Sequence, residues 1–157
     1  MASEQLDELE HQAWQGFLIT HQRLWDAFAA RLAPLNVTMA EYSAMALLGE
    51  AGPKGIRMSE LAERTLMSSG GFTRLADRLE RRGLIQRRRS AVDRRGSEAV
   101  LTRSGRALMR RAWRQHSGDL RELFFDRLDD AQLRGLVEVW ASLEPQRGTA
   151  ERAPGDD

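Results

Sequence analysis

Met58–Thr102 has the sequence MSELAERTLMSSGGFTRLADRLERRGLIQRRRSAVDRRGSEAVLT. Its first half carries apolar residues at the three- and four-residue spacing of two short helices, which the small residues of 67–71 separate. Gly83 is expected to end the second helix, because glycine adopts the left-handed conformation of a helix C-terminus without strain. Residues 84–89 and 97–101 then predict two strands joined by a polar loop with a basic tip. This stretch therefore predicts a helix-turn-helix followed by a β-hairpin, which we call the wing.

Long helical patterns flank this stretch on both sides. Side chains that accept hydrogen bonds from a helix N-terminus predict where each helix begins. They are Ser3, Thr38 with Glu41, Ser59, Thr102 or Ser104, and Asp129 with Gln132. The first helix ends before Pro34 and has a wide apolar stripe, with Trp14 and Trp25 beside it, that exceeds what one small domain is expected to cover. We therefore expect a second chain to cover it.

The predicted fold class is mainly α with a small β-hairpin wing, in which a winged helix-turn-helix lobe joins a helical dimerisation region. The dimerisation region comprises residues 1–35 and 103–144, and the winged helix-turn-helix lobe comprises residues 36–102. Residues 145–157 are polar and are expected to form a disordered tail. A chain of 157 residues is long enough to bury a core of its own.

The net charge of +1 conceals an uneven distribution along the chain. Between Arg64 and Arg95 there are ten arginines and three acidic residues, so the flanking segments are acidic overall. A basic segment of this kind favours the binding of a polyanion, and a solvated arginine-rich face is the alternative.

Composition excludes several kinds of chemistry. The chain has no cysteine, so disulfides, thiol nucleophiles and thiol redox sensing are excluded. His11, His21 and His116 are scattered singly, and we expect no metal and no other cofactor. No glycine-rich phosphate loop follows a strand, and Asp129-Asp130 is better explained by helix capping, so the chain is predicted not to be an enzyme. No apolar run could span a bilayer and the first ten residues are unlike a secretory signal, which predicts a cytoplasmic protein that does not bind membranes.

The helix-turn-helix predicts duplex DNA as a partner, because the second helix of such a pair enters the major groove. Small residues at its start allow backbone N–H groups to approach a phosphate oxygen, while Thr73 and Arg74 are placed to reach base edges. Arg74 is the first candidate for base recognition, with a phosphate contact as the alternative. The residues expected to contact DNA are Ser68, Ser69, Gly71, Thr73, Arg74, Arg78, Arg88, Arg94 and Arg95.

The predicted tip of the wing is Asp93-Arg94-Arg95-Gly96, from which an arginine is expected to enter the narrow minor groove. Asp93 is expected to order Arg95 through an ion pair, because an acid on a DNA-binding loop is otherwise unfavourable. A simple turn is the alternative.

Three motifs in this stretch together resemble the MarR family, the multiple antibiotic resistance regulators. They are SELA at Ser59–Ala62, TRLxDRLExxGLI at Thr73–Ile85, and DxRxxxxxLT at 93–102. The resemblance spans about Leu6 to Leu143. It implies a homodimer whose first, fifth and sixth helices interlock, with two recognition helices in successive major grooves of a pseudo-palindromic site. The pair Gly70-Gly71 departs from the family pattern, since glycine weakens the start of the recognition helix.

The resemblance also implies regulation by a small aromatic or anionic ligand between the dimerisation helices and the lobe. At the corresponding levels lie His21, Trp25, Tyr42, Met45, Trp113 and His116. Aromatic side chains at helical spacing more often pack in a core, and this is the alternative for each of them.

These features predict a DNA-binding transcription regulator, a homodimeric repressor that occupies a promoter and is released by such a ligand. The alternative is a helical dimeric interaction module that uses the basic segment to bind an acidic protein. The wing distinguishes the two hypotheses, because a protein-only scaffold has no need of a glycine-flanked arginine tip between two short strands.

Overall fold

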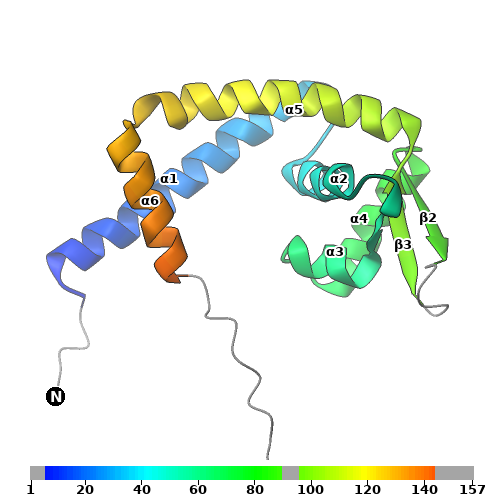
Figure 1. Ribbon diagram of the computed structural model, residues 1–157, viewed down its shortest axis with the longest axis horizontal. Helices are drawn as coiled ribbons and strands as arrows, with labels where there is room; N and C mark the ends of the chain where they lie inside the picture. The colour runs from blue at the N-terminus through cyan, green and yellow to red at the C-terminus, as the bar shows by residue number, and fades with distance from the viewer. Residues whose placement is uncertain (1–5, 90–95, 144–157) are drawn as a thin grey trace, which may run out of the picture. The chain divides into compact units, whose positions relative to one another are not determined.

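The computed structural model describes residues 6–89 and 96–143 of the chain. Its helices are α1 (Glu8–Leu32), α2 (Met39–Ala51), α3 (Met58–Arg64), α4 (Ser69–Arg81), α5 (Arg103–Leu123) and α6 (Asp130–Leu143), and its strands are β1 (Ile56–Arg57), β2 (Ile85–Arg89) and β3 (Ser97–Leu101), as labelled in Figure 1. Short 3-10 helices lie at η1 (Ala33–Leu35), η2 (Gly52–Lys54) and η3 (Phe125–Arg127). This architecture confirms the predicted fold class. Among the described helices, none has the length and apolar character needed to cross a membrane.

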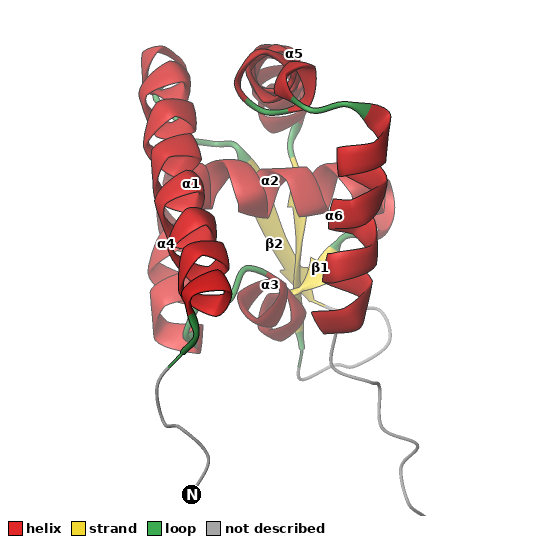
Figure 2. Cartoon of the chain, turned by 90° about the vertical axis from the view of Figure 1, so that its left-hand side faces the viewer, coloured by secondary structure: helices red, strands yellow, loops and turns green. Residues whose placement is uncertain are grey.

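The chain divides into two compact units, Met1–Asp119 and Leu120–Asp157. In the first unit, α2 lies between α5 and α3, and the strands lie at one end of these helices (Figure 1). Figure 2 shows the same strands behind α2 and α3. The predicted lobe, residues 36–102, was defined by its expected role in DNA binding, whereas these two units are defined by their compactness. Its boundaries therefore stay a prediction.

The sheet has three antiparallel strands in the order β1, β3, β2. Ala99 in β3 pairs with Ile56 of β1 on one side and with Arg87 of β2 on the other. The two wing strands confirm the prediction for 84–89 and 97–101, whereas β1 was not predicted. A strand of two residues is too short to show an alternation of apolar and polar side chains in the sequence. It forms because the edge of β3 has backbone groups available for pairing.

Most predicted helix starts are confirmed. Reciprocal capping boxes begin α2, where Thr38 pairs with Glu41, and α6, where Asp129 pairs with Gln132. The Thr102 hydroxyl accepts from the Gly105 N–H at the start of α5.

Two predicted starts differ. Ser59 does not cap α3, because the helix begins at Met58, two residues earlier than predicted, and Arg57, at the N-cap, makes no capping hydrogen bond with its side chain. Helix α1 begins at Glu8 with a capping box of Asp7 and Glu10, and Ser3 lies outside the described residues.

The core of the first unit is aliphatic. Its most deeply buried large side chains are Leu32, Met45, Leu48, Leu61, Leu75 and Leu79. Gly105 lets α5 approach the carbonyl of Leu84, because a Cβ at this position would collide with that oxygen. This contact fixes the first turn of α5 against the base of the wing.

Helices α1 and α6 leave apolar surface uncovered in the single chain. Of α1, Phe28 and Leu32 are buried, whereas Trp14 and Trp25 are exposed. In the second unit, α6 has no buried residue and exposes Trp140 among other apolar side chains. Apolar faces of this length are unusual on a lone chain.

Candidate nucleic-acid interface

Helices α3 and α4 form the predicted helix-turn-helix, joined by a tight turn. The Thr65 hydroxyl donates to the Leu61 carbonyl, and the Met67 N–H donates to the Ala62 carbonyl. These backbone carbonyls at the end of α3 therefore have hydrogen-bond donors within the turn. Leu66, between them, has a φ of 55° and is 96% exposed. The turn therefore places α4 directly after α3 at the cost of one strained leucine.

The N-terminus of α4 is exposed and capped by Ser68, whose hydroxyl accepts from the Gly71 N–H at 3.2 Å. The helix starts at Ser69, so Gly70 and Gly71 belong to its first turn rather than to the separating segment expected at 67–71. The Thr73 hydroxyl is turned back to the Ser69 carbonyl at 2.8 Å. The first N–H groups of a helix have no acceptor within the helix, so this end is suited to an anion.

Arg74 is exposed on α4 and has no hydrogen-bond or ion-pair partner among the described residues. Thr73 beside it is exposed as well. The structure thus leaves the guanidinium of Arg74 available for a partner outside the chain.

The other predicted arginine of α4, Arg78, is engaged within the chain. Its Nε donates to Glu41 Oε1 at 3.3 Å, and Arg82 donates to Glu41 Oε2 at 3.1 Å. The Glu41 side chain is 4% exposed. Burial raises the pKa of this carboxyl, but the Thr38 N–H and the two arginines outweigh burial and hold the pKa below its ordinary value. Glu41 is therefore a buried anion shared by Arg78 of α4 and by Arg82, the C-cap residue of this helix.

A second set of ion pairs joins α4 to the wing. Arg87 of β2 contacts Asp77 and Glu80 of α4, each with an N–O distance of 2.6 Å. The hydrogen bonds from Arg87 lower the pKa of Glu80. No role was predicted for Asp77, and Glu41 was predicted only to cap α2. The sequence could have suggested the pairing of Arg87, since Asp77 and Glu80 are three residues apart on one helix face.

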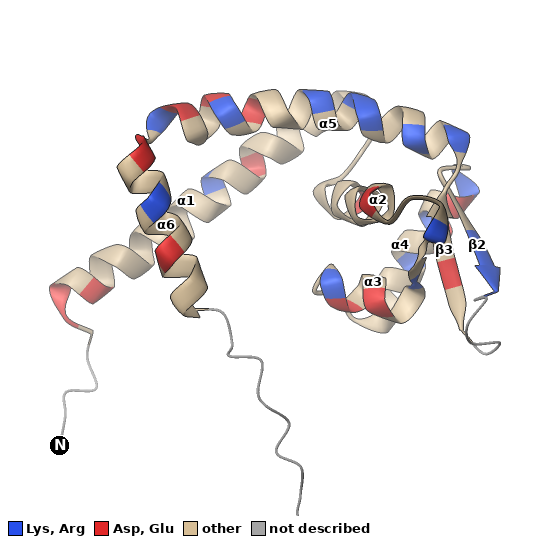
Figure 3. Cartoon of the chain, viewed as in Figure 1, with Lys and Arg blue, Asp and Glu red and all other residues tan. Residues whose placement is uncertain are grey.

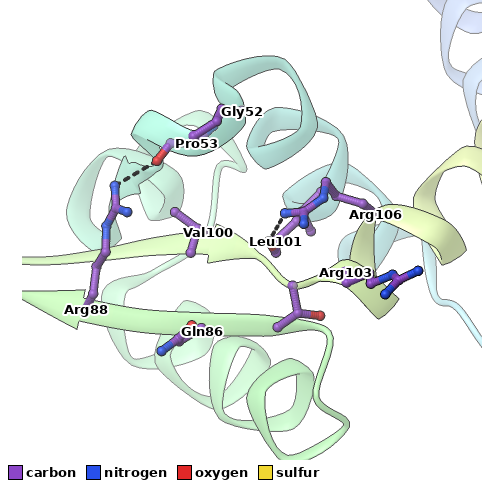
Figure 4. A pocket seen from close by; sticks show the side chains of 9 residues that line it. Gly52, Pro53, Gln86, Arg88, Val100, Leu101, Arg103 and Arg106 are labelled. Atoms are coloured by element: carbon purple, nitrogen blue, oxygen red, sulfur yellow. Dashed lines mark hydrogen bonds between the residues drawn. The ribbon is translucent and has the colours of Figure 1, made fainter.

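Arg88 of β2 is engaged with η2 and with Glu98 of β3. Its Nη2 donates to the carbonyls of Pro53 and Lys54 at 2.9 and 2.6 Å, and its Nε lies 3.4 Å from Glu98. Figure 4 shows this side chain reaching from β2 toward Pro53, at the rim of a hollow of about 380 Å³ that Arg106 also lines. These bonds hold η2 against the wing, so a DNA contact by Arg88 stays a prediction.

Positive charge gathers on β2 and on the first half of α5, as Figure 3 shows. The predicted tip of the wing, with Asp93, Arg94 and Arg95, lies outside the described residues.

Of the six residues predicted to bind a ligand, Tyr42, Met45 and His116 are buried and the other three are exposed. Tyr42 and His116 are in contact, with ring centroids 4.6 Å apart, and Phe28, which was not predicted, lies 4.7 Å from His116. Burial raises the pKa of Tyr42 to about 12. Met45 is fully buried in the core.

The other three predicted ligand residues are exposed. His21 stacks on Trp25 along α1, with centroids 5.9 Å apart. Trp113 lines a mostly apolar hollow of about 380 Å³ beside Met109 and Ala46. That all six residues bind one ligand stays a prediction.

His116 and Asp119 are buried polar residues at the junction of α5 with α1 and α2. Asp119 accepts from Arg31 at 2.8 Å and from Gln115 at 3.0 Å through Oδ1. Burial lowers the pKa of His116, and the carboxylate of Asp119 opposes this shift. The atoms His116 Nδ1 and Asp119 Oδ2 have no hydrogen-bond partner within the described residues.

Comparison with known proteins gives consistent matches. The model of the MarR family matches residues 35–96. The chain is similar to the uncharacterized HTH-type transcriptional regulator YpoP of Bacillus subtilis, with 32% identity over 111 residues that cover 68% of this chain and 74% of that protein.

Two solved structures extend the match over most of the chain. Sco3205, a MarR family transcriptional regulator from Streptomyces coelicolor in complex with DNA, is 26% identical with a TM-score of 0.84, covering 94% of this chain and 95% of that one. CouR, a transcriptional repressor bound to a 23-mer DNA duplex, is 31% identical with a TM-score of 0.70, covering 88% of this chain and 99% of that one.

Proposed function

The chain belongs to the MarR family of DNA-binding transcription regulators, and we propose that it acts as a homodimeric repressor that occupies a pseudo-palindromic operator. In this proposal the two copies insert their α4 helices into successive major grooves, so that bound protein excludes polymerase from the promoter. Solved relatives that carry DNA support it, one of them being described as a repressor.

The observation that carries the proposal is the unpaired Arg74. Arg78, Arg82 and Arg87 around α4 each form an ion pair with an acid, whereas Arg74 has no acceptor among the described residues. An exposed guanidinium one turn into a recognition helix fits the paired acceptors of guanine in the major groove. The backbone and hydroxyls at Ser68, Ser69 and Gly71 would then meet a phosphate, and Thr73 a neighbouring base or phosphate.

The wing is proposed to make the second contact. Arg94 and Arg95 at its tip would meet the phosphates and the minor groove, with Asp93 ordering Arg95. The positive charge of β2, which leads to this tip, supports the proposal (Figure 3).

The dimer is proposed from the apolar faces of α1 and α6. Trp14, Trp25 and Trp140 are each more than 40% exposed in the single chain. A second copy would remove these faces from water and hold two α4 helices at a fixed separation.

Release by a small aromatic or anionic ligand remains part of the proposal. The apolar hollow beside Trp113, with Arg106 and Arg110 on its border, has the composition such a ligand needs. The contact between Tyr42 and His116, which is buried, favours core packing for those two residues.

The test is a binding experiment with duplex DNA selected from a random library by the protein itself. Affinity for the selected duplex should exceed that for a scrambled duplex by at least about a thousandfold, and it should fall steeply with salt as phosphate counterions are released. Arg74→Ala should lower affinity for the selected duplex much more than for the scrambled one. Binding that is independent of salt, or equal for both duplexes, would refute the proposal.

A further inference from the structure

Helix α4 is held by ion pairs on two flanks. At 100° per residue, Arg78 and Arg82 point about 150° away from Asp77 and Glu80 around the helix axis. Glu41 of α2 holds the first flank, and Arg87 of β2 holds the second. The apolar residues Phe72, Leu75, Ala76 and Leu79 fill the remaining face.

Arg74 lies between these two flanks, on the side of α4 turned away from the apolar face. It precedes Arg78 by four residues and Arg82 by eight, so the three arginines form one stripe in which each step turns by about 40°. The direction of Arg74 therefore follows the rotation of the half of the helix that carries Arg78 and Arg82.

The hydrogen bonds of Glu41 fix that rotation. Besides the two arginines, its carboxylate accepts from the Thr38 N–H at 3.1 Å, which locks it to the first turn of α2. Arg82 is held a second time, because its Nη2 donates to the Asn36 carbonyl at 2.6 Å. The C-terminal half of α4 is thus tied by directional bonds to the segment 36–41.

Apolar packing alone would fix the rotation less well. Contacts between aliphatic side chains are non-directional, so they restrict the rotation of a helix only through the shapes of the packed surfaces. Hydrogen bonds to ionised groups are stronger and demand both distance and angle. Because the Glu41 carboxylate is buried, water competes for it less than at a pair in which both side chains are exposed.

We propose that Glu41 is a positioning residue for DNA recognition. Its ion pairs with Arg78 and Arg82 fix the rotation of α4 about its own axis, and this rotation determines where the exposed Arg74 side chain points. Glu41 itself lies beneath the helix and makes no DNA contact. The inference rests on the proposed function, in which α4 is the recognition helix and Arg74 contacts a base.

The experiment measures the ratio of affinities for a library-selected duplex and a scrambled duplex of equal length, in the full chain. Glu41→Gln keeps the shape of the side chain but removes its charge. Glu50→Gln is the matched control, because Glu50 is exposed, pairs with Arg64 of α3 at 3.7 Å and makes no ion pair with α4 among the described residues. Each change removes one negative charge and so raises the net charge of the protein by one. The non-specific electrostatic effects of the two changes on DNA affinity are therefore alike.

Glu41→Gln should lower the ratio about tenfold, and Glu50→Gln should leave it unchanged. The decisive measurement repeats Arg74→Ala in both backgrounds. In the wild type this change should cost about tenfold in the ratio, whereas in Glu41→Gln it should cost less than about twofold, because Arg74 is already misdirected. A general loss of stability would leave the two effects additive.

Equal losses from Arg74→Ala in the two backgrounds would overturn the inference. If the wild type itself showed no preference for the selected duplex, the proposed function would fail first, and the two failures are thus distinguishable. Should Glu41→Gln not fold, Arg82→Gln loosens the same contact from the solvent side and serves in its place.

Discussion

Arg31 of α1 donates a 2.8 Å hydrogen bond to the carboxylate of Asp119 on α5, joining residues 88 positions apart in the chain. The Asp119 side chain is 3% exposed and that of Arg31 is 33% exposed. This ion pair joins the end of α1 to the C-terminal part of α5.

The first prediction concerns this ion pair. Asp119→Ala leaves the guanidinium of Arg31 without its buried partner, and should lower the free energy of unfolding by about 1–3 kcal/mol, less than for a fully buried pair because Arg31 is partly hydrated. Urea denaturation at a fixed protein concentration measures it. Glu60→Ala, which breaks the exposed pair with Arg64, should cost under about 0.5 kcal/mol. Equal effects from the two variants would contradict the role given to Asp119.

The second prediction concerns pH. Burial lowers the pKa of His116 in the folded chain below its ordinary 6.5, against the opposing influence of Asp119. As pH falls below about 6.5, the unfolded chain takes up a proton at this histidine before the folded chain does, so the folded state loses stability. The slope is at most about 1.4 kcal/mol per pH unit, and it ends at the lowered pKa.

Variants separate this histidine from the other acid-sensitive groups. His116→Gln should remove the loss of stability just below pH 6.5, whereas His21→Gln, at an exposed position on α1, should retain it. Glu41 and Glu80, whose pKa values are lowered, contribute at more acidic pH, since their stabilisation is lost as pH falls through their folded pKa values. An unchanged profile in His116→Gln would show that this histidine titrates alike in both states.

Local signals explain why most of the fold could be predicted. A capping box such as Thr38 with Glu41 needs two residues three positions apart, and it forms from short-range hydrogen bonds. The strand β1 was missed for the opposite reason. Ile56 becomes a strand residue by pairing with Ala99, 43 positions later, and nothing in its own neighbourhood records that partner.

In the DNA-binding site, too, local signals could be read from the sequence, whereas contacts between distant residues could not. Arg74 was identified from its position at the start of a recognition helix, and it has no ion-pair partner within residues 6–89 and 96–143. The second role of Glu41 could not be predicted, because its contacts with Arg78 and Arg82 lie 37 and 41 positions away. Arg78 and Arg88 were selected for their charge, and charge alone does not reveal that Glu41 and the carbonyl of Lys54 already occupy them.

The third prediction uses the strained turn before α4. Leu66 has a φ of 55° and is 96% exposed, so it suffers backbone strain and gains nothing from burial in the single chain. Leu66→Gly should raise the free energy of unfolding by about 0.5–1 kcal/mol, since the relief of strain exceeds the greater freedom of glycine in the unfolded chain. Leu66→Ala keeps the Cβ that causes the strain and should show no such gain. Thermal unfolding of the three proteins side by side measures both effects.

The fourth prediction compares two glycines of one helix. A Cβ at Gly105 would collide with the carbonyl oxygen of Leu84, which is backbone and cannot move without shifting the base of the wing. Gly118, farther along α5, has open space at the same position. Gly105→Ala should therefore destabilise the protein by about 2 kcal/mol or more, and because it displaces the wing it should also weaken DNA binding. Gly118→Ala should stabilise α5 by up to about 1 kcal/mol, as expected for alanine in an open helical position. Urea denaturation gives both signs, and a Gly105→Ala protein as stable as the wild type would mean that α5 does not rest against Leu84.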